Sequence, residues 1–335
     1  MLTLYEVIIR PQSLFGTPLA GDTLFGHLCW QFALDATLLT RPFADCVRAY
    51  AVRPFLVISS AFPRIRRDQT EGYALPCPDL SLFADKIDKI PLHEKLARRK
   101  TMKKNKWFFV GQKLLPHFEK NTLMDAEKVA EGIRALHGEV CLGDPAFQQE
   151  VERSHNSINR LTGTTGEGNF APFTTDAFSF LPRTTLAVFV LADTNVCPSK
   201  SLHTAFDRVG TFGYGRDAST GLGRFSVEDL RKRELPQNPQ ANACYTLAPC
   251  VPPQPHATLK VWAKPLTRFG KHGGIPEPRP FKAPVVMAEA GAVFQLDTLP
   301  QNGFWGSGVT GVSKARPETI VQGYAPILPC TVKEA

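Results

Sequence analysis

The chain has 335 residues, a length that allows about two domains. Because 43% of the residues are hydrophobic and 21% are charged, the chain can form a packed core, and a wholly disordered protein is excluded. No run of about 20 apolar residues exists, so a membrane-spanning helix is excluded as well. The formal net charge is +8, and residues 95–120 hold nine Lys or Arg but only one acidic residue. This segment indicates a polyanionic partner or, with about equal weight, a solvated basic helix or loop.

The N-terminal sequence lacks the basic and apolar segments of a secretory signal, so we expect a cytoplasmic protein with reduced thiols. No two of the eight cysteines are spaced as Cys-x-x-Cys, and no carboxylate cluster stands out. We therefore expect neither a metal site nor a cofactor.

Apolar periodicity predicts the first elements. A helix is expected to begin at Asp22 as its N-cap, because Phe25, Leu28 and Phe32 follow at helical spacing. The expected elements are a strand at 2–10, this helix at 22–36, a short helix at 42–51 and a strand at 54–61.

The pattern weakens over residues 62–170, which we interpret as a large insertion outside the core. One helix is predicted within it, at 125–137, with Asp125 as N-cap and Gly138 just past its end.

The pattern then resumes with strands at 173–181 and 183–192, a helix at 199–209 and a strand at 223–228. Without the insertion, the order strand, helix, strand, strand, helix, strand is that of the ferredoxin-like (RRM-like) arrangement, so we expect an α+β fold in a domain over 1–235.

A Pro/Asn/Gln-rich link at 236–240 precedes a smaller, mostly β C-terminal domain over 241–335. Its expected strands lie at 244–248, 257–264, 284–289, 292–297 and 319–328.

The densest candidate site is a glycine-rich segment, with five glycines among residues 210–223. Bare amides in such a loop form a concavity that binds anions, so we expect a cradle for a phosphate backbone; a long irregular turn is the alternative. The RNA-binding candidates here are Gly213, Tyr214, Gly215, Arg216, Ser219, Thr220, Gly221, Gly223 and Arg224.

Two further clusters are rich in hydrogen-bond donors. Residues 155–165 offer an Arg fork and short polar side chains, although a solvated hairpin tip is the alternative. Residues 268–274 are basic and include Phe269, which could stack on a base; an ordinary exposed loop is the alternative. The candidates are His155, Asn156, Asn159, Arg160, Thr162, Lys271 and His272, and the loop-flanking rings of Phe15, Phe212 and Tyr214 are candidates for stacking.

Catalytic signals are weak. His27 is expected to lie off the buried stripe of the first helix and could act as an acid/base in RNA cleavage, but a helix histidine without catalytic role is the stronger interpretation. No nucleophile elbow or zinc-protease motif occurs. We expect no enzyme activity.

Four segments occur together in the order typical of one family. They are Phe15 to Gly26, His155 to Thr165, Gly213 to Phe225, and Lys271 to Gly274 with Phe281 to Phe294, the last followed by Gly306 to Gly311 and Gln322 to Ala325. Together they resemble the RAMP superfamily of CRISPR effector subunits, and more closely the type III-A (Csm-type) subunit that holds the 5′ handle of the CRISPR RNA (crRNA). Asn159 stands where that family has an acid.

The resemblance implies two ferredoxin-like domains, the second degenerate, and a β-hairpin thumb. It implies a non-catalytic subunit of antiviral defence that caps the effector backbone by gripping the crRNA 5′ handle. Its partners would be the large polymerase-like subunit and the backbone RAMP subunit. The first segment adds Phe15, Thr17, Asp22 and Thr23 to the RNA-binding candidates.

A cap needs backbone amides against phosphates, a few Arg or Lys, and pockets for unstacked bases, so the loops at 213–223 and 155–165 are expected to form two sides of one groove. Two alternatives stay open. One is a RAMP endoribonuclease that processes precursor RNA with His27; the other is a structural assembly subunit without handle specificity.

Overall fold

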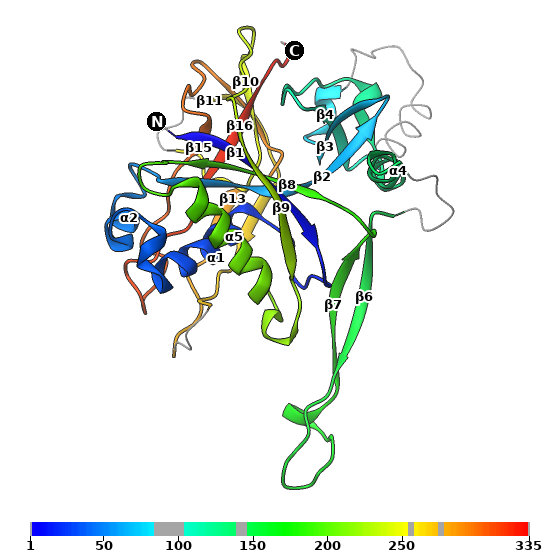
Figure 1. The fold of residues 1–335 in the computed structure, drawn as a ribbon, viewed down its shortest axis with the longest axis vertical. Coiled ribbons are helices and arrows are strands. Elements are labelled where there is room, and N and C mark those ends of the chain that lie inside the picture. The colour runs from blue at the N-terminus through cyan, green and yellow to red at the C-terminus, as the bar shows by residue number, and fades with distance from the viewer. Residues whose placement is uncertain (1, 84–103, 139–145, 254–257, 274–277, 334–335) are drawn as a thin grey trace.

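The computed structural model describes residues 2–83, 104–138, 146–253, 258–273 and 278–333 (Figure 1). They form a seven-stranded sheet, a five-stranded sheet and two two-stranded ribbons. No helix within these ranges is long and apolar enough to cross a membrane.

The centre of the seven-stranded sheet is formed by strands in the order β2-β8-β1-β9, each antiparallel to its neighbours. All seven residues of β8 are buried, because β8 lies between β2 and β1 in the middle of the sheet. The strands are β1 (Thr3–Pro11), β2 (Leu56–Arg67), β8 (Leu186–Ala192) and β9 (Phe225–Arg233).

Helices α1 (Gly21–Leu34) and α5 (Ser199–Phe212) lie side by side over this sheet (Figure 1), with α1 against β2 and α5 against β9. The predicted apolar face of α1 is buried as expected. Its N-cap is Ala20 rather than the predicted Asp22. Asp22 lies two residues later, in the first turn, and its side chain pairs with Arg268. The short α2 (Phe43–Ala49) follows α1.

The expectation that residues 62–170 lie outside the core is wrong in part. β2 continues to Arg67, and three further strands extend the same sheet in the order β5-β4-β3-β2. Helix α4 (Ala126–Leu136) packs against β2, and Asp125 accepts a hydrogen bond from the Lys128 amide as the predicted N-cap. The added strands are β3 (Thr70–Pro76), β4 (Trp107–Gly111) and β5 (Leu123–Met124). The basic segment lies outside the described residues up to position 103.

The strand predicted at 173–181 does not join the main sheet. β7 (Phe173–Phe180) instead pairs with β6 (Gln148–His155) in a long hairpin that projects from the body (Figure 1). The root of the hairpin is fixed by the bridge between Phe15 and Phe178.

The C-terminal region forms the five-stranded sheet in the order β11-β14-β10-β16-β15, and an arm made of the ribbon β12-β13. Its core is continuous with the N-terminal core: Tyr245, Tyr324 and Leu328 belong to the same buried cluster as Tyr50. The strands are β10 (Ala243–Thr246), β11 (Thr258–Trp262), β12 (Pro265–Arg268), β13 (Val285–Ala288), β14 (Val293–Leu296), β15 (Phe304–Gly306) and β16 (Tyr324–Cys330).

Candidate nucleic-acid interface

The glycine-rich loop between α5 and β9 is folded tightly on itself. Gly213, Gly215, Gly221 and Gly223 all have φ between +73° and +100°, a region that glycine tolerates and other residues do not favour. A Cβ on Gly223 would lie 2.0 Å from the Tyr214 carbonyl oxygen. The glycines therefore serve the internal packing of the loop.

Most backbone amides of this loop already donate hydrogen bonds within the fold. The amide of Gly215 donates to His27 Nε2 (3.1 Å), that of Arg216 to Thr17 Oγ1 (2.9 Å) and that of Gly223 to the Leu14 carbonyl (2.7 Å). The expectation of a ribbon of bare amides is therefore wrong over most of the loop. The amides donating within the fold are those of Gly213, Tyr214, Gly215, Arg216, Thr220, Gly221, Leu222, Gly223 and Arg224.

The part of the loop that remains for a ligand is the short 3-10 turn Ala218–Thr220 and the basic side chains beside it. The first amides of a helical turn have no partner within the turn, so those of Asp217, Ala218 and Ser219 are the loop's remaining donors. Ser219, Thr220 and Arg224 are exposed. Part of the Arg216 guanidinium is already engaged, because its Nη2 donates to the Asp176 carbonyl at the root of the hairpin.

His27 anchors the loop. Its ring lies 4.9 Å from the Tyr214 ring, and its Nε2 accepts the hydrogen bond from the Gly215 amide. Burial lowers the pKa of His27 to about 4, so the imidazole is neutral near pH 7. His27 lies off the buried stripe of α1, as expected, and the glycine-rich loop covers it there.

Two of the three aromatic candidates for stacking are buried. The Phe15 ring is 0% exposed and packs on Phe178 and Phe180. Tyr214 is also 0% exposed; its hydroxyl donates to the Pro18 carbonyl (2.7 Å) and accepts from the Ala20 amide (3.1 Å). Neither ring can stack on a base without losing this packing, so these two expectations are wrong.

The arm packs its inner face on α1. Arg268 Nε lies 2.6 Å from Asp22 Oδ2, and the half-buried Lys282 lies near Asp22 and Cys29. Burial raises the pKa of Asp22, although the Arg268 guanidinium opposes that shift. Asp22, expected at the RNA, is therefore the buried anchor of the arm. His272 Nε2 lies 2.8 Å from Ser313 Oγ, which fixes the end of the arm.

The glycine-rich loop and the arm flank an outer stripe of α1. Thr23, Gly26, His27 and Trp30 share this stripe at helical spacing, and none of them is fully buried. The loop reaches it at His27, and the arm reaches it at Gly273, whose Cβ position is 3.8 Å from Trp30 Nε1. We call this stripe, with the 218–224 part of the loop and residues 268–273 of the arm, the α1 site.

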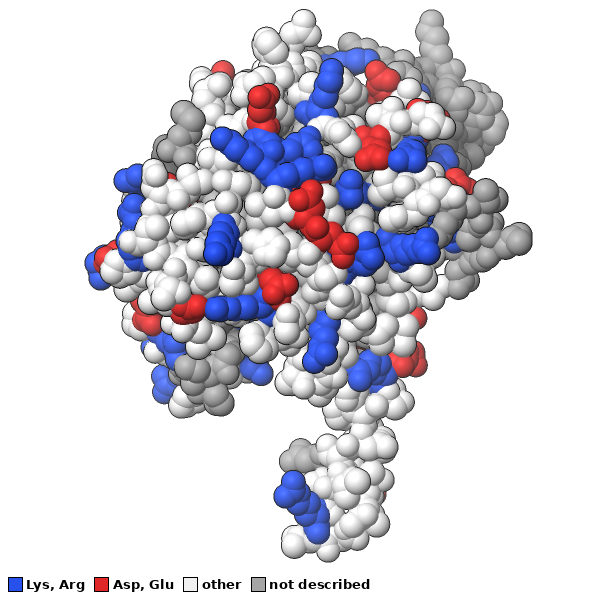
Figure 2. Space-filling view, in the orientation of Figure 1, with Lys and Arg blue, Asp and Glu red and all other residues white. Residues whose placement is uncertain are grey.

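The hairpin cluster lies elsewhere. The His155 ring stacks on Phe173 (5.0 Å, 9°), and Asn159 accepts from the Leu161 amide (2.9 Å). Asn156, Arg160 and Thr162 belong to the segment that joins β6 to β7. The end of this hairpin stands clear of the body (Figure 2). The predicted groove between the loops at 155–165 and 213–223 is therefore not formed by this chain alone, because only the hairpin root approaches the glycine-rich loop.

Sequence reasoning missed an arginine cluster on the seven-stranded sheet. Glu6 is fully buried and pairs with Arg233 Nη1 (2.7 Å) and Arg231 Nε (3.0 Å), and it accepts from the Tyr73 hydroxyl (2.8 Å). Arg233 also donates to the carbonyl of Gln112, so the cluster ties β9 to the end of β4. A charged residue within the apolar run of β1, and alternating Arg on β9, were the available signals.

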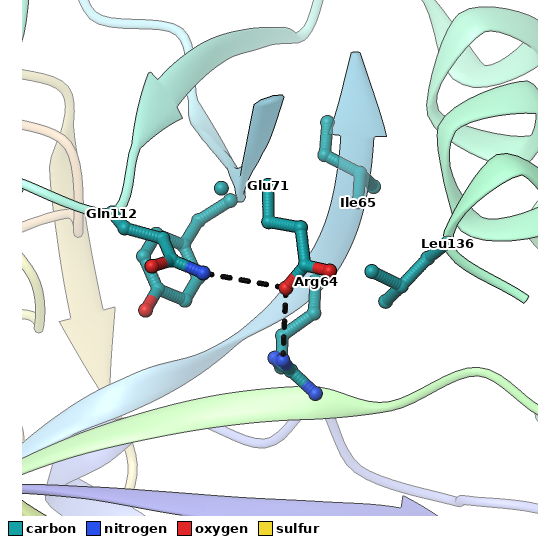
Figure 3. Close-up of a pocket in the computed structure, with 7 residues that line it drawn as sticks. Arg64, Ile65, Glu71, Gln112 and Leu136 are labelled. Atoms are coloured by element: carbon teal, nitrogen blue, oxygen red, sulfur yellow. Dashed lines mark hydrogen bonds and ion pairs between the residues drawn. The ribbon is translucent and has the colours of Figure 1, made fainter. Parts of the chain in front are cut away.

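A second ion-pair group adjoins this cluster. Arg66 Nη2 lies 2.8 Å from Glu71 Oε1. Figure 3 shows the other two contacts of Glu71: Arg64 lies 3.7 Å from Oε2, and Gln112 Nε2 donates to the same oxygen. The Arg66 hydrogen bond lowers the pKa of Glu71. These groups join β2, β3 and β4, which explains why the region predicted as an insertion is held to the main sheet. No group of three or more metal-ligating side chains occurs among the described residues.

Comparison with known proteins gives a structural answer only. No family model and no curated protein matches the sequence. Among solved structures, the Csm1–Csm4 cassette in complex with pppApA matches with 15% identity over 99% of both chains and a TM-score of 0.54. The Csm3–Csm4 subcomplex of the type III-A CRISPR-Cas interference complex matches with 12% identity over 97% of this chain and 99% of that one, with a TM-score of 0.53. The matching subunit is Csm4. The chain therefore has the fold of the Csm4 subunits of type III-A CRISPR complexes, which confirms the predicted resemblance at the level of the fold.

Proposed function

We propose that this chain is the crRNA-binding subunit of a type III CRISPR effector complex, acting in the cytoplasm, and that it grips the 5′ handle at the α1 site. Its partners would be a large subunit like Csm1 and a backbone subunit like Csm3, the proteins with which the similar chains were solved. The order β1-α1-β2-β8-α5-β9 supports a ferredoxin-like N-terminal domain.

One observation carries the proposal: two basic segments far apart in the sequence flank the half-buried outer stripe of α1. Arg224 and Lys271 are exposed at these two flanks. Single-stranded RNA is held by positive charge along its backbone together with flat surfaces for its bases. Between the two flanks the stripe supplies Trp30, with the Arg316 guanidinium 5.5 Å from the centre of its ring.

We further propose that the chain does not cut RNA. An acid/base catalyst works best when its pKa lies near the operating pH. The pKa of His27 is about 4 and its Nε2 accepts from the Gly215 amide, which suits a structural anchor and disfavours the endoribonuclease alternative.

The test of handle binding is a titration of the full chain with labelled handle RNA and with a length-matched scrambled RNA, over a range of salt concentrations. We expect tighter binding to the handle. Arg224→Gln and Lys271→Gln should each weaken binding and reduce the slope of log K against log salt by about 0.7, the value for one phosphate contact on a single strand. The matched control is Arg48→Gln on α2, whose side chain is 78% exposed.

Equal affinity for the handle and the scrambled RNA would instead support the structural assembly subunit. Site-specific cutting of repeat RNA in EDTA, lost in His27→Ala, would support the endoribonuclease. Either result would overturn the proposed function.

A further inference from the structure

The arm has two faces of different character. Lys271 and Phe281 are directly opposed in an antiparallel bridge, and the amides of Lys282 and His272 donate to the carbonyls of Gly270 and Pro280. This pattern makes Lys271 and Phe281 a non-hydrogen-bonded pair, in which side chains on one face approach each other most closely.

Contacts and exposure assign the remaining side chains, because the pairing shifts by one residue between Arg268–Val285 and Lys271–Phe281. Arg268, Gly270 and Lys282 face inward: Arg268 pairs with Asp22, and a Cβ on Gly270 would lie 3.0 Å from the Lys282 side chain. Phe269 lies between two of these inward residues and is itself exposed, so it belongs to the outer face with Lys271. The ion pair and the half-buried lysine hold the inner face on α1, which supports the outer face.

The outer face exposes large apolar groups that nothing in the described chain covers. The exposed fractions are 74% for Phe269, 73% for Phe281 and 66% for Val286. Lys271 Nζ lies 6.0 Å from the centre of the Phe281 ring, within the range of a cation–π contact. The outer face therefore combines two exposed phenyl rings with the Lys271 cation, which lies over one of them.

Charge favours one occupant of this face. Residues 264–286 contain one acidic residue and five Lys or Arg. Arg268 and Lys282 lie on the inner face beside the α1 site, whereas Lys264, Lys271 and Arg279 are exposed. Nucleobases stack on exposed aromatic rings while the adjoining phosphates seek positive charge, so single-stranded RNA matches both properties of the face.

We propose that Phe269 and Phe281 are a stacking platform for two unpaired bases of the RNA strand whose phosphates Arg224 and Lys271 hold at the α1 site. The inference rests on the proposed function and adds to it the residues that receive the bases. Because phenyl rings stack on any base, the platform supplies affinity, and base identity is read elsewhere.

The test compares Phe269→Leu, Phe281→Leu and the double variant with Val52→Ala in the same RNA titration. Val52 is the control because its apolar side chain is 91% exposed just after α2, in no segment assigned to RNA. We expect each arm variant to lose about 5- to 100-fold in affinity, the range for one base stacked on an aromatic ring, without change in the salt slope. The control should bind as the unmodified chain does.

An RNA series with one abasic nucleotide at a time adds a second measurement. At the nucleotides that stack, the abasic RNA should weaken binding to the unmodified chain and cause no further loss with the double variant. The rings are exposed, so the melting temperature should not change, and circular dichroism verifies the fold.

The outcomes separate the two proposals. If the double variant binds handle RNA normally while Arg224→Gln weakens binding, the platform is wrong and the proposed function stands. If the double variant keeps its RNA affinity but loses a large subunit like Csm1, the outer face is a protein interface and the platform is again overturned. If none of the variants changes the RNA affinity and scrambled RNA binds as tightly as handle RNA, the proposed function itself is wrong.

Discussion

Gly26 occupies a position in α1 where the fold gives no reason for glycine. No atom lies within 4 Å of the place where its Cβ would be, and its φ is not in the left-handed region. Glycine within a helix costs about 0.5–1 kcal/mol relative to alanine. Under the proposed function, a glycine on the outer stripe of the α1 site would let the RNA approach the helix closely.

We therefore expect Gly26→Ala to raise the free energy of unfolding by about 0.5–1 kcal/mol while weakening handle RNA binding. Urea denaturation and RNA titration of the same variant measure the two effects. A variant that is stabilised and binds RNA with unchanged affinity would place the RNA away from α1.

His27 predicts a pH effect on stability. Its pKa in the folded chain is about 4, below the ordinary value of 6.5, so between these values the unfolded chain binds a proton that the folded chain does not. The free energy of unfolding should thus fall as the pH decreases from about 6.5 to about 4. His27→Gln keeps an acceptor for the Gly215 amide and removes the titration.

Comparison of urea midpoints at pH 7 and pH 5 tests this expectation, because only the difference between His27→Gln and the unmodified chain isolates this histidine. We expect the variant to lose less stability than the unmodified chain on acidification. An equal loss would show that the His27 ring is not desolvated as described.

At the scale of elements, the sequence predicts the glycine-rich loop, but it does not predict that most of the loop's amides donate within the fold. Spacing of glycines reveals that a loop needs unusual backbone conformations, and it does not reveal whether the freed amides face a ligand or the fold. The side chains of Ser13, Thr17 and His27, more than 180 residues away along the chain, take up three of those amides. Such distant pairing could not be predicted from local pattern.

Gly221 and Gly223 give a matched test of this internal role. Both have φ above +70°, but a Cβ on Gly221 meets no atom within 4 Å, whereas one on Gly223 would lie 2.0 Å from the Tyr214 carbonyl oxygen. Gly221→Ala should cost about 1–2 kcal/mol from backbone strain alone. Gly223→Ala should cost more, because the loop must also open. Thermal denaturation compares the two, and equal costs would contradict the tight fold of the loop.

The hydrophobic periodicity predicted the helices and strands that build the centre of the main sheet. It failed at residues 62–76, where β2 runs on through Arg64, Arg66 and Arg67 into β3. Alternating arginines look like a surface segment when the sequence is considered alone. In the structure, two of these arginines pair with Glu71 of the neighbouring strand, a contact that only the sheet register creates.

At the scale of the whole molecule, the two predicted domains share one core. Gln322, fully buried beside β16, donates to the Ile58 carbonyl (2.7 Å) and accepts from the Ile58 amide (2.8 Å) of β2. Aromatic residues of β10 and β16 belong to the buried cluster that lies under α1. The boundary at 236–240 stays a prediction, since composition marks a link and says little about how the two sides pack.

We expect the two regions to unfold together. Gln322→Ala leaves two buried backbone groups without partners and should cost about 1–3 kcal/mol for each group left unsatisfied. Urea unfolding followed by tryptophan fluorescence and by circular dichroism should give coincident single transitions, shifted together in the variant. Two separate transitions, with only one of them shifted, would show independent domains.

The account depends most on where the RNA strand lies. Photo-crosslinking of the full chain to handle RNA that carries 4-thiouridine, followed by peptide mapping, measures this directly. The account predicts crosslinks in α1 around Trp30, in the loop at 218–224 and in the arm around Phe269 and Phe281. Crosslinks confined to the hairpin tip or to the arginine cluster around Glu6, with none in these three segments, would contradict it.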